Sequence, residues 1–324
     1  MPAWTAWLAL SFVGALAGTW ALRRYALAKG LMDQPGQRRS HAVVTPRGGG
    51  MSIVLVVLLA AVAAAWLFPP HRSSLLGFAA GLVVVAGIGW WDDHRPLSAA
   101  LRLAVHALAS AWLGWLSYRA GAGPFEAMFA AGSCVVLINV WNFMDGINGL
   151  AASQALLAAA AFALVLPFPA AWIAVALAGA CMGFLPFNFP KARIFMGDGG
   201  SGSLGYVLAA LMAWAVLAKG AAWWWAWVPL TAFLVDAGFT LVARMLARQR
   251  WWEPHAQHVY QGLARKLQSH GWVTFGYGCF SVFALVLFLL LGATQRSFAV
   301  PAVGAWLAFA MAIWFFLRKG LRDR

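Results

Sequence analysis

Aspartates stand at the ends of three separate apolar runs in this sequence of 324 residues. Asp92 and Asp93 close one run, Asp145 closes another, and Asp198 opens a third. One such group alone would indicate only a solvated loop end, but three groups favour a shared site. Because adjacent carboxylates repel each other, a divalent cation or basic side chains from other segments would stabilise them. We therefore take all four aspartates as candidate catalytic residues.

Amide side chains accompany one of these aspartates in the segment NVWNFMDGING. Asn139, Asn142, Asp145 and Asn148 follow one another at steps of three residues, and each can supply an oxygen ligand. The segment has no cysteine and no paired histidines, and a set made only of oxygen ligands is typical of a site for Mg²⁺, with Mn²⁺ as the alternative. The segment therefore indicates a magnesium site.

The segment FMGDGGSGSLG, residues 195–205, matches the dinucleotide-binding pattern G-x-G-x-x-G. A Rossmann site requires a strand before this pattern and a ribose-binding acid within a βαβ unit, and the surrounding sequence offers neither. We expect instead that a helix begins here and that the amides of Gly199 and its neighbours form a nest for an anion beside Asp198. Lys191 and Arg193 add positive charge, so the segment suits a pyrophosphate bridged by Mg²⁺.

Two histidines mark the long basic connection 247–271, which contains EPHAQHVYQGLARK. Pro254 suits the first position of a helix, so we expect a short helix that carries His255 and His258 one turn apart on the same face. The alternative is a surface helix whose histidines have no role. Both histidines are candidate substrate-binding residues.

The segment SHAVVTPRGGG, residues 40–50, places His41 and Arg47 before the glycine-rich start of an apolar run. An ordinary basic loop is the alternative interpretation of this segment. We include His41 and Arg47, together with Arg102 beyond the aspartate pair, among the candidate substrate-binding residues.

The elements that must position these residues are the apolar runs. Hydrophobic residues make up 63% of the chain and charged residues only 10%, against roughly 25% in soluble domains. Runs of about 20 residues recur from end to end, which is the length of a helix that crosses a bilayer, whereas a barrel would need short alternating strands. We predict one all-α, polytopic membrane domain over residues 1–324. About eleven transmembrane helices are expected, at 3–22, 50–68, 74–91, 99–117, 125–141, 149–166, 168–187, 201–218, 222–246, 272–292 and 298–317.

Basic residues are distributed unevenly between these expected helices. One set of alternate connections holds 19 Lys and Arg residues and the other set holds 4. The positive-inside rule then places the N-terminus outside and the C-terminus in the cytoplasm, together with the loop 247–271 and its short helix. All three aspartate groups lie at the cytoplasmic side. The net charge of +14 therefore reports orientation, and no nucleic acid partner is expected.

Taken together, these segments resemble the polyprenyl-phosphate N-acetylhexosamine-1-phosphate transferase family. The aspartate pair of the family matches Asp92 and Asp93. Its pattern N-x-x-N-x-x-D-G-x-[DN]-G matches residues 139–149, and its M-G-D-x-G-S matches residues 196–201. The matching segments run from Ser40 to about Lys266 in the same order as in the family.

The resemblance implies that Asn142 and Asp198 hold Mg²⁺ against the pyrophosphate of a nucleotide sugar, and that the region of Asp92 meets a lipid phosphate. The implied reaction moves an N-acetylated sugar-1-phosphate from a UDP-sugar to undecaprenyl phosphate and releases UMP. The implied location is the bacterial cytoplasmic (inner) membrane, with the active site facing the cytoplasm. A homodimer is a further expected form of the protein.

Two departures from the family pattern favour one branch of it. The peptidoglycan branch carries three consecutive histidines in the late loop, whereas this chain reads H-A-Q-H from His255, and Asn148 replaces an aspartate of that branch. The loop is more similar to the branch that initiates O-antigen, a lipopolysaccharide component. A transporter of cations or sugar phosphates is the alternative class, although transporters usually place such charges near the middle of the membrane. CDP-alcohol phosphotransferases are another alternative, but MDGINGLAA lacks their arginine.

Overall fold

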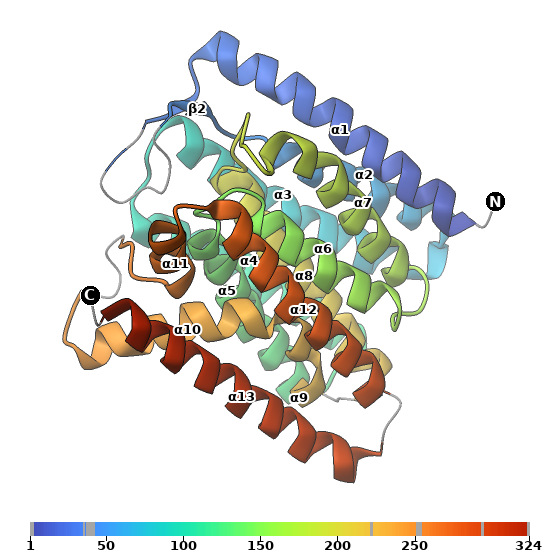
Figure 1. Cartoon of the computed structure of the whole chain (residues 1–324). Helices are drawn as coiled ribbons and strands as arrows, with labels where there is room; N and C mark the ends of the chain where they lie inside the picture. The colour runs from blue at the N-terminus through green and yellow to red at the C-terminus, as the bar shows by residue number, and fades with distance from the viewer. Residues whose placement is uncertain are drawn as a thin grey trace.

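The computed structural model describes residues 3–34, 36, 43–220, 223–250, 255–292 and 295–322. These residues form a bundle of helices with a single short strand pair, so the prediction of an all-α fold is confirmed (Figure 1). The helices are α1 (Ala3–Lys29), α2 (Met51–Leu67), η1 (Pro69–His71), α3 (Arg72–His94), α4 (Ala99–Arg119), α5 (Pro124–Met144), α6 (Leu150–Ala163), α7 (Ala170–Asn188), α8 (Asp198–Ala218), α9 (Trp223–Ala226), η2 (Val228–Leu230), α10 (Thr231–Leu246), α11 (Val259–Leu267), α12 (His270–Gly292) and α13 (Arg296–Arg322).

Nine helical segments of the described chain are long and apolar enough to cross a membrane. Two more, α2 and α6, are apolar but shorter, with 17 and 14 residues. The chain is therefore a multi-pass membrane protein. The number of eleven spans and the orientation of the termini remain predictions.

Helix α8 lies at the centre of the bundle and packs against α3 and α5, whereas α1 and α13 lie on opposite outer sides (Figure 1). Every residue of α8 from 199 to 213 is buried. Small residues make this position possible, because they let neighbouring helices approach closely in a membrane. At Gly89 of α3, a Cβ atom would lie 2.5 Å from the carbonyl oxygen of Asp198. Gly89 therefore brings the end of α3 against the start of α8.

Two short strands connect the end of α1 to the start of α2. Strand β1 (Met32–Asp33) pairs antiparallel with β2 (Thr45–Pro46). Beyond β2, the amides of Gly49 and Gly50 donate to the carbonyl oxygens of residues 195 and 196, each at 2.9 Å. The start of α2 is thus tied to the segment that precedes α8. The described residues contain no βαβ unit, as expected when the Rossmann pattern was rejected.

The short helix of the connection 247–271 begins later than the sequence predicted. Helix α11 starts at Val259, with His258 as its N-terminal cap, and His255 lies before it in a non-helical segment. Pro254 lies outside the described residues. The expectation that both histidines share a helical face is therefore wrong. The physical reason is that the carboxylate of Asp236 accepts from the amides of Val259 and Tyr260, so the helix begins at Val259.

Candidate functional site

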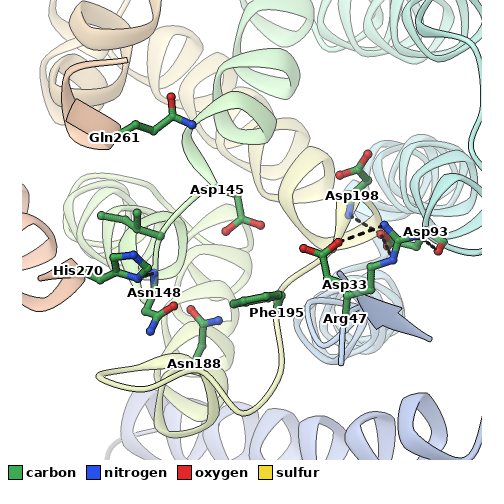
Figure 2. A pocket seen from close by; sticks show the side chains of 13 residues that line it. Asp33, Arg47, Asp93, Asp145, Asn148, Asn188, Phe195, Asp198, Gln261 and His270 are labelled. Atoms are coloured by element: carbon green, nitrogen blue, oxygen red, sulfur yellow. Dashed lines mark hydrogen bonds and ion pairs between the residues drawn. The ribbon is translucent and has the colours of Figure 1, made fainter. Parts of the chain in front are cut away.

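The start of α8, the end of α3 and the turn after α5 enclose a cavity of about 240 Å³. Three of the four candidate aspartates, Asp93, Asp145 and Asp198, line this cavity. Figure 2 shows Asp145 between two groups of side chains, with Asp198, Asp93 and Arg47 on one side and Asn148 and His270 on the other. Residues more than 100 positions apart in the sequence therefore share one site.

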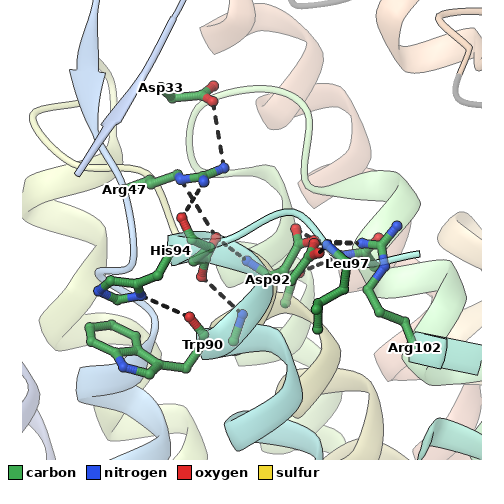
Figure 3. A network of polar contacts seen from close by, with 12 residues as sticks. Asp33, Arg47, Trp90, Asp92, His94, Leu97 and Arg102 are labelled. Carbon is green, nitrogen blue, oxygen red and sulfur yellow. Dashed lines mark hydrogen bonds and ion pairs between the residues drawn. The ribbon is translucent and has the colours of Figure 1, made fainter. Parts of the chain in front are cut away.

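Arg102 joins two of the aspartates. Its Nη1 atom donates to Oδ2 of Asp92 at 2.9 Å and to Oδ2 of Asp198 at 2.8 Å. The other oxygen of Asp92 accepts from the amide of Leu97 at 2.6 Å (Figure 3). Asp92 does not itself line the cavity, so Arg102 is its link to Asp198. A guanidinium shared by two carboxylates stabilises negative charge that would otherwise repel.

Asn142 holds the remaining oxygen of Asp198. Its Nδ2 atom lies 3.1 Å from Oδ1 of Asp198 and 3.1 Å from Oγ of Ser201. Asn142 lies in the last turn of α5 and Ser201 in the first turn of α8, so this contact fixes the two helix ends relative to each other. The motif NVWNFMDGING and the motif MGDGGS meet here.

The carboxylate of Asp93 occupies the nest that the glycine-rich segment was expected to offer to a phosphate. Its Oδ1 accepts from the amide of Asp198 at 3.1 Å and its Oδ2 from the amide of Gly199 at 3.2 Å. Gly197 precedes them with φ 79°, and a Cβ atom there would lie 2.5 Å from Oδ2 of Asp93. The expected role of Gly199 in anion binding is therefore wrong for a substrate phosphate, because an internal carboxylate caps the helix.

Arg47 approaches the same carboxylate from the segment before α2. Its Nε atom lies 3.9 Å from Oδ1 of Asp93, and its Nη2 donates to the carbonyl oxygen of Asp93. Its Nη1 lies 4.0 Å from Oδ1 of Asp33 (Figure 3). The side chain of Arg47 is 26% exposed, so its positive charge remains accessible to a ligand in the cavity.

Asp145 caps the end of α5 and lies in the wall of the cavity. Burial raises its pKa well above the ordinary value of 3.8, and the charges of Asp198 and Asp93 raise the pKa further. Beyond it, the amide of Asn148 donates to Nδ1 of His270 at 3.4 Å, and Nδ2 of Asn148 donates to the carbonyl oxygen of Pro190 at 3.0 Å. The turn after α5 is thus held at Asn148.

Several of the candidate substrate-binding residues do not line the cavity. Asn139 donates to the carbonyl oxygen of Val135 in its own helix at 2.8 Å, and Arg193 donates to that of Pro186 and stacks over Phe187. Lys191 is exposed on the loop before α8. The structure does not bring these three residues to the lining of the cavity, and their contact with a substrate stays a prediction.

The two loop histidines form a pair of their own, apart from the lining of the cavity. Their ring centroids lie 4.8 Å apart, and Nδ1 of His258 lies 4.0 Å from Oδ1 of Asp236. Burial lowers the pKa of His258 and lowers that of His255 to about 4, so both rings are neutral near pH 7. His41 lies outside the described residues.

Five further polar residues at the site were not selected from the sequence. Ser201 contacts Asn142, and the other four line the cavity: Asp33, Asn188, Gln261 and His270. Ser201 lies inside the quoted M-G-D-x-G-S motif and could have been chosen from it. The others come from α7, α12, α11 and the first strand, whose patterns carry no chemical signal before the chain is folded.

The donor set at Asp198 suits Mg²⁺. This ion is usually bound by one or two carboxylates together with substrate phosphates and waters. The described residues hold no group of three or more His, Cys, Asp or Glu side chains that could hold a metal ion. Asp198 lines the cavity, and the amide of Asn142 is hydrogen-bonded to it. A half-turn of that amide would present its oxygen beside the carboxylate, so the pair fits an ion that a diphosphate completes.

Comparison with known proteins agrees with this geometry. The profile described as "Glycosyl transferase family 4" matches residues 75–216, which include α3 to α8 and so the aspartates of α3 and α8. Over this segment the chain is similar to glycosyl transferase family 4. The resemblance to polyprenyl-phosphate N-acetylhexosamine-1-phosphate transferases is thereby confirmed.

Individual relatives span several branches of the family. The chain is 34% identical over 223 residues to the decaprenyl-phosphate N-acetylglucosaminephosphotransferase of Mycobacterium tuberculosis, which covers 59% of the chain and 55% of that protein. It is 31% identical over 234 residues to a phospho-N-acetylmuramoyl-pentapeptide-transferase of Thermosynechococcus vestitus, covering 64% and 62%. It is 26% identical over 277 residues to the undecaprenyl-phosphate alpha-N-acetylglucosaminyl 1-phosphate transferase of Thermotoga maritima, covering 83% of each.

Proposed function

We propose that this chain transfers an N-acetylated sugar-1-phosphate from a UDP-sugar to undecaprenyl phosphate. The observation that carries the proposal is the direct contact of Asp198 with both Arg102 and Asn142, which brings three sequence motifs to one cavity. The names of the relatives support the class of acceptor and the amino-sugar phosphate that is moved.

In the proposed reaction, an oxygen of the lipid phosphate attacks the phosphorus that carries the sugar. The bond between this phosphorus and the UMP oxygen breaks, so UMP leaves and a lipid-linked sugar diphosphate forms. A phosphate ester has a second pKa of about 6, so the nucleophile is largely ionised and needs little help from a base. Most of the catalysis is then positioning and charge neutralisation, as in other phosphoryl transfers.

The residues divide this work between them. Asn142 and Asp198 would hold Mg²⁺, which when bound neutralises the negative charge of the diphosphate. Arg47 and Arg102 supply positive charge beside the aspartates, where an incoming lipid phosphate would be attracted. Asp145 lines the cavity in which the phosphates would react. The cavity is mostly polar side chains, as a charged substrate requires.

The proposed location is the bacterial cytoplasmic membrane, with the cavity open to the cytoplasm. The excess of Lys and Arg on one set of connections supports this orientation. The loop sequence H-A-Q-H supports a place for this chain in the branch that starts O-antigen synthesis. O-antigen synthesis is therefore the proposed pathway, and an N-acetylated sugar is the proposed sugar.

The test is release of UMP by the purified full chain in detergent, with a panel of UDP-N-acetylated sugars. Release must depend on added undecaprenyl phosphate and on Mg²⁺, and the labelled sugar must appear in the lipid fraction. UMP release without the lipid acceptor, or no release with any donor of the panel, would overturn the proposal. Uptake of sugar phosphate or cations by vesicles containing the chain, without UMP release, would favour a transporter.

A further inference from the structure

A second carboxylate centre lies outside the cavity, on α10. Asp236 is only 2% exposed. It accepts hydrogen bonds from four different helices. Oδ1 accepts from the amide of Val259 at 2.8 Å, Oγ1 of Thr240 at 3.3 Å and Nε1 of Trp314 at 3.4 Å, and Oδ2 accepts from the hydroxyl of Tyr277 at 2.7 Å and the amide of Tyr260 at 3.0 Å.

The amide contacts determine where α11 begins. The amides of a first helical turn have no partner within the helix, and a carboxylate there also favours the positive end of the helix dipole. Asp236 accepts from the first two amides of α11, those of Val259 and Tyr260, each within 3.0 Å. A buried carboxylate with this many donors is strongly held, because its desolvation is offset by hydrogen bonds. The position of α11 therefore depends on a residue of α10.

Tyr260 carries this position to the candidate site. Its hydroxyl donates to the carbonyl oxygen of Phe143 at 3.0 Å, directly after Asn142. The same hydroxyl would lie 2.1 Å from a Cβ atom at Gly146, directly after Asp145. Tyr260 is fully buried, so its ring is rigidly packed. One tyrosine thus contacts the turn 142–146 at two points on either side of Asp145.

We propose that Asp236 is a positioning residue for this enzyme, which acts through α11 and Tyr260 to hold the turn 142–146 in its working geometry. The proposal rests on the proposed function, because it requires Asn142 and Asp145 to act on the substrate. The path has two hydrogen-bonded steps, from Asp236 to the start of α11 and from Tyr260 to Phe143, and then follows the backbone from Phe143 to Asn142. A displacement of about 1 Å at reacting groups can cost about a hundredfold in rate.

A buried tyrosine, Tyr260, and a half-buried one, Tyr277, provide a pair of variants. The hydroxyl of Tyr260 donates to the carbonyl oxygen of Phe143, whereas the hydroxyl of Tyr277 donates to Asp236. Tyr260→Phe and Tyr277→Phe each remove one hydroxyl from the same network. If Asp236 and its network only stabilise the fold, the two changes should have similar effects on kcat. If they position the turn 142–146, Tyr260→Phe should lower kcat more than Tyr277→Phe.

The first measurement is steady-state kinetics of UMP release by the full-length variants. Tyr260→Phe is expected to lower kcat about tenfold and to leave the KM for both substrates within about twofold, while Tyr277→Phe stays within about twofold of the original chain in kcat. Asp236→Asn is expected to lower kcat at least as much as Tyr260→Phe. The kcat of the double variant Asp236→Asn/Tyr260→Phe should be no lower than that of Asp236→Asn alone, because the effects of residues that act through one path are not additive.

Equal losses of kcat in Tyr260→Phe and Tyr277→Phe would overturn the proposal. A loss of kcat in the double variant that equals the product of the two single losses would also overturn it. If Asp236→Asn does not fold, the tyrosine pair still decides the outcome.

The second measurement needs no substrate. Hydrogen–deuterium exchange of the peptide that covers residues 144–149 is expected to rise in Tyr260→Phe and in Asp236→Asn, and to stay unchanged in Tyr277→Phe. Unchanged exchange in the first two variants would overturn the positioning role even if the chain is active. Failure of the original chain to release UMP would count against the proposed function alone, because the exchange experiment would still report on the path from Asp236 to the turn.

Discussion

Replacement of Asp198 by Asn removes one negative charge from the site and keeps the shape of the side chain. In the structure, Oδ2 of Asp198 accepts from Arg102 at 2.8 Å and Oδ1 accepts from Asn142 at 3.1 Å. An asparagine can keep its oxygen towards Arg102 and turn its amino group to Asn142, whose own amide can turn over to accept. The fold should therefore survive, at a cost of about 1 kcal/mol for the weaker bond to the guanidinium.

The expected effect on turnover is much larger than the effect on stability. Loss of one preorganised charge-stabilising group typically lowers kcat by about 10²–10³-fold, or about 2.7–4 kcal/mol. Within the described part of the chain, Asp198 supplies the only carboxylate oxygen that is hydrogen-bonded to Asn142. Asp198→Asn should therefore lower kcat for UMP release by at least about a hundredfold, and the remaining activity should need more Mg²⁺.

The assay is UMP release across a Mg²⁺ titration, with thermal unfolding in the same detergent as the measure of folding. Ser201→Ala is the matched control, because it removes the other partner of Asn142, at 3.1 Å, without changing the charge. The control should lose no more than about fivefold in kcat. A kcat for Asp198→Asn within threefold of the original chain, with the same Mg²⁺ dependence, would refute the assignment of Asp198 as a metal ligand.

Three other outcomes are expected. Gly89→Val should lower both the unfolding temperature and kcat, because its Cβ would lie 2.5 Å from the carbonyl oxygen of Asp198, and a normal unfolding temperature would contradict the close approach of α3 and α8. Arg102→Met should destabilise the fold by about 1–3 kcal/mol in denaturant unfolding, because Asp92 and Asp198 lose their shared partner, and high salt should reduce the difference. In EDTA, stability should fall as pH rises above about 3.8, because burial raises the pKa of Asp145 and the folded state then binds more protons than the unfolded state. Asp145→Asn should weaken this dependence in thermal unfolding from pH 4 to 8, and an unchanged slope would show that Asp145 is not its source.

The helical bundle and the gathering of the aspartates could be predicted from the sequence. Apolar runs of membrane length locate helices with little ambiguity, since a chain in lipid must satisfy its own backbone hydrogen bonds. The aspartates at the ends of those runs were expected on one side, and the structure brings Asp92, Asp93 and Asp198 into one network. The association of Asn142 with Asp198 was also expected, and it is present at 3.1 Å.

The acceptors that bind the free backbone amides at the starts of α8 and α11 could not be predicted from the sequence. The glycine-rich start of α8 was expected to bind a phosphate, but Asp93 takes its amides, and Pro254 suggested an earlier start for α11 than the capped one at Val259. Both errors have one cause. A helix start has free amides whatever surrounds it, and the acceptor that satisfies them comes from a distant segment.

By itself, the sequence determined that this protein lies in a membrane, which segments are helical and which residue types meet at the helix ends, because burial in lipid and the length of a bilayer constrain each segment locally. Only the tertiary structure decided which carboxylate pairs with which partner. The structure places Arg102 between Asp92 and Asp198. It also places Asp236 at the start of α11. Hydrogen bonds of about 3 Å depend on the packing of whole helices.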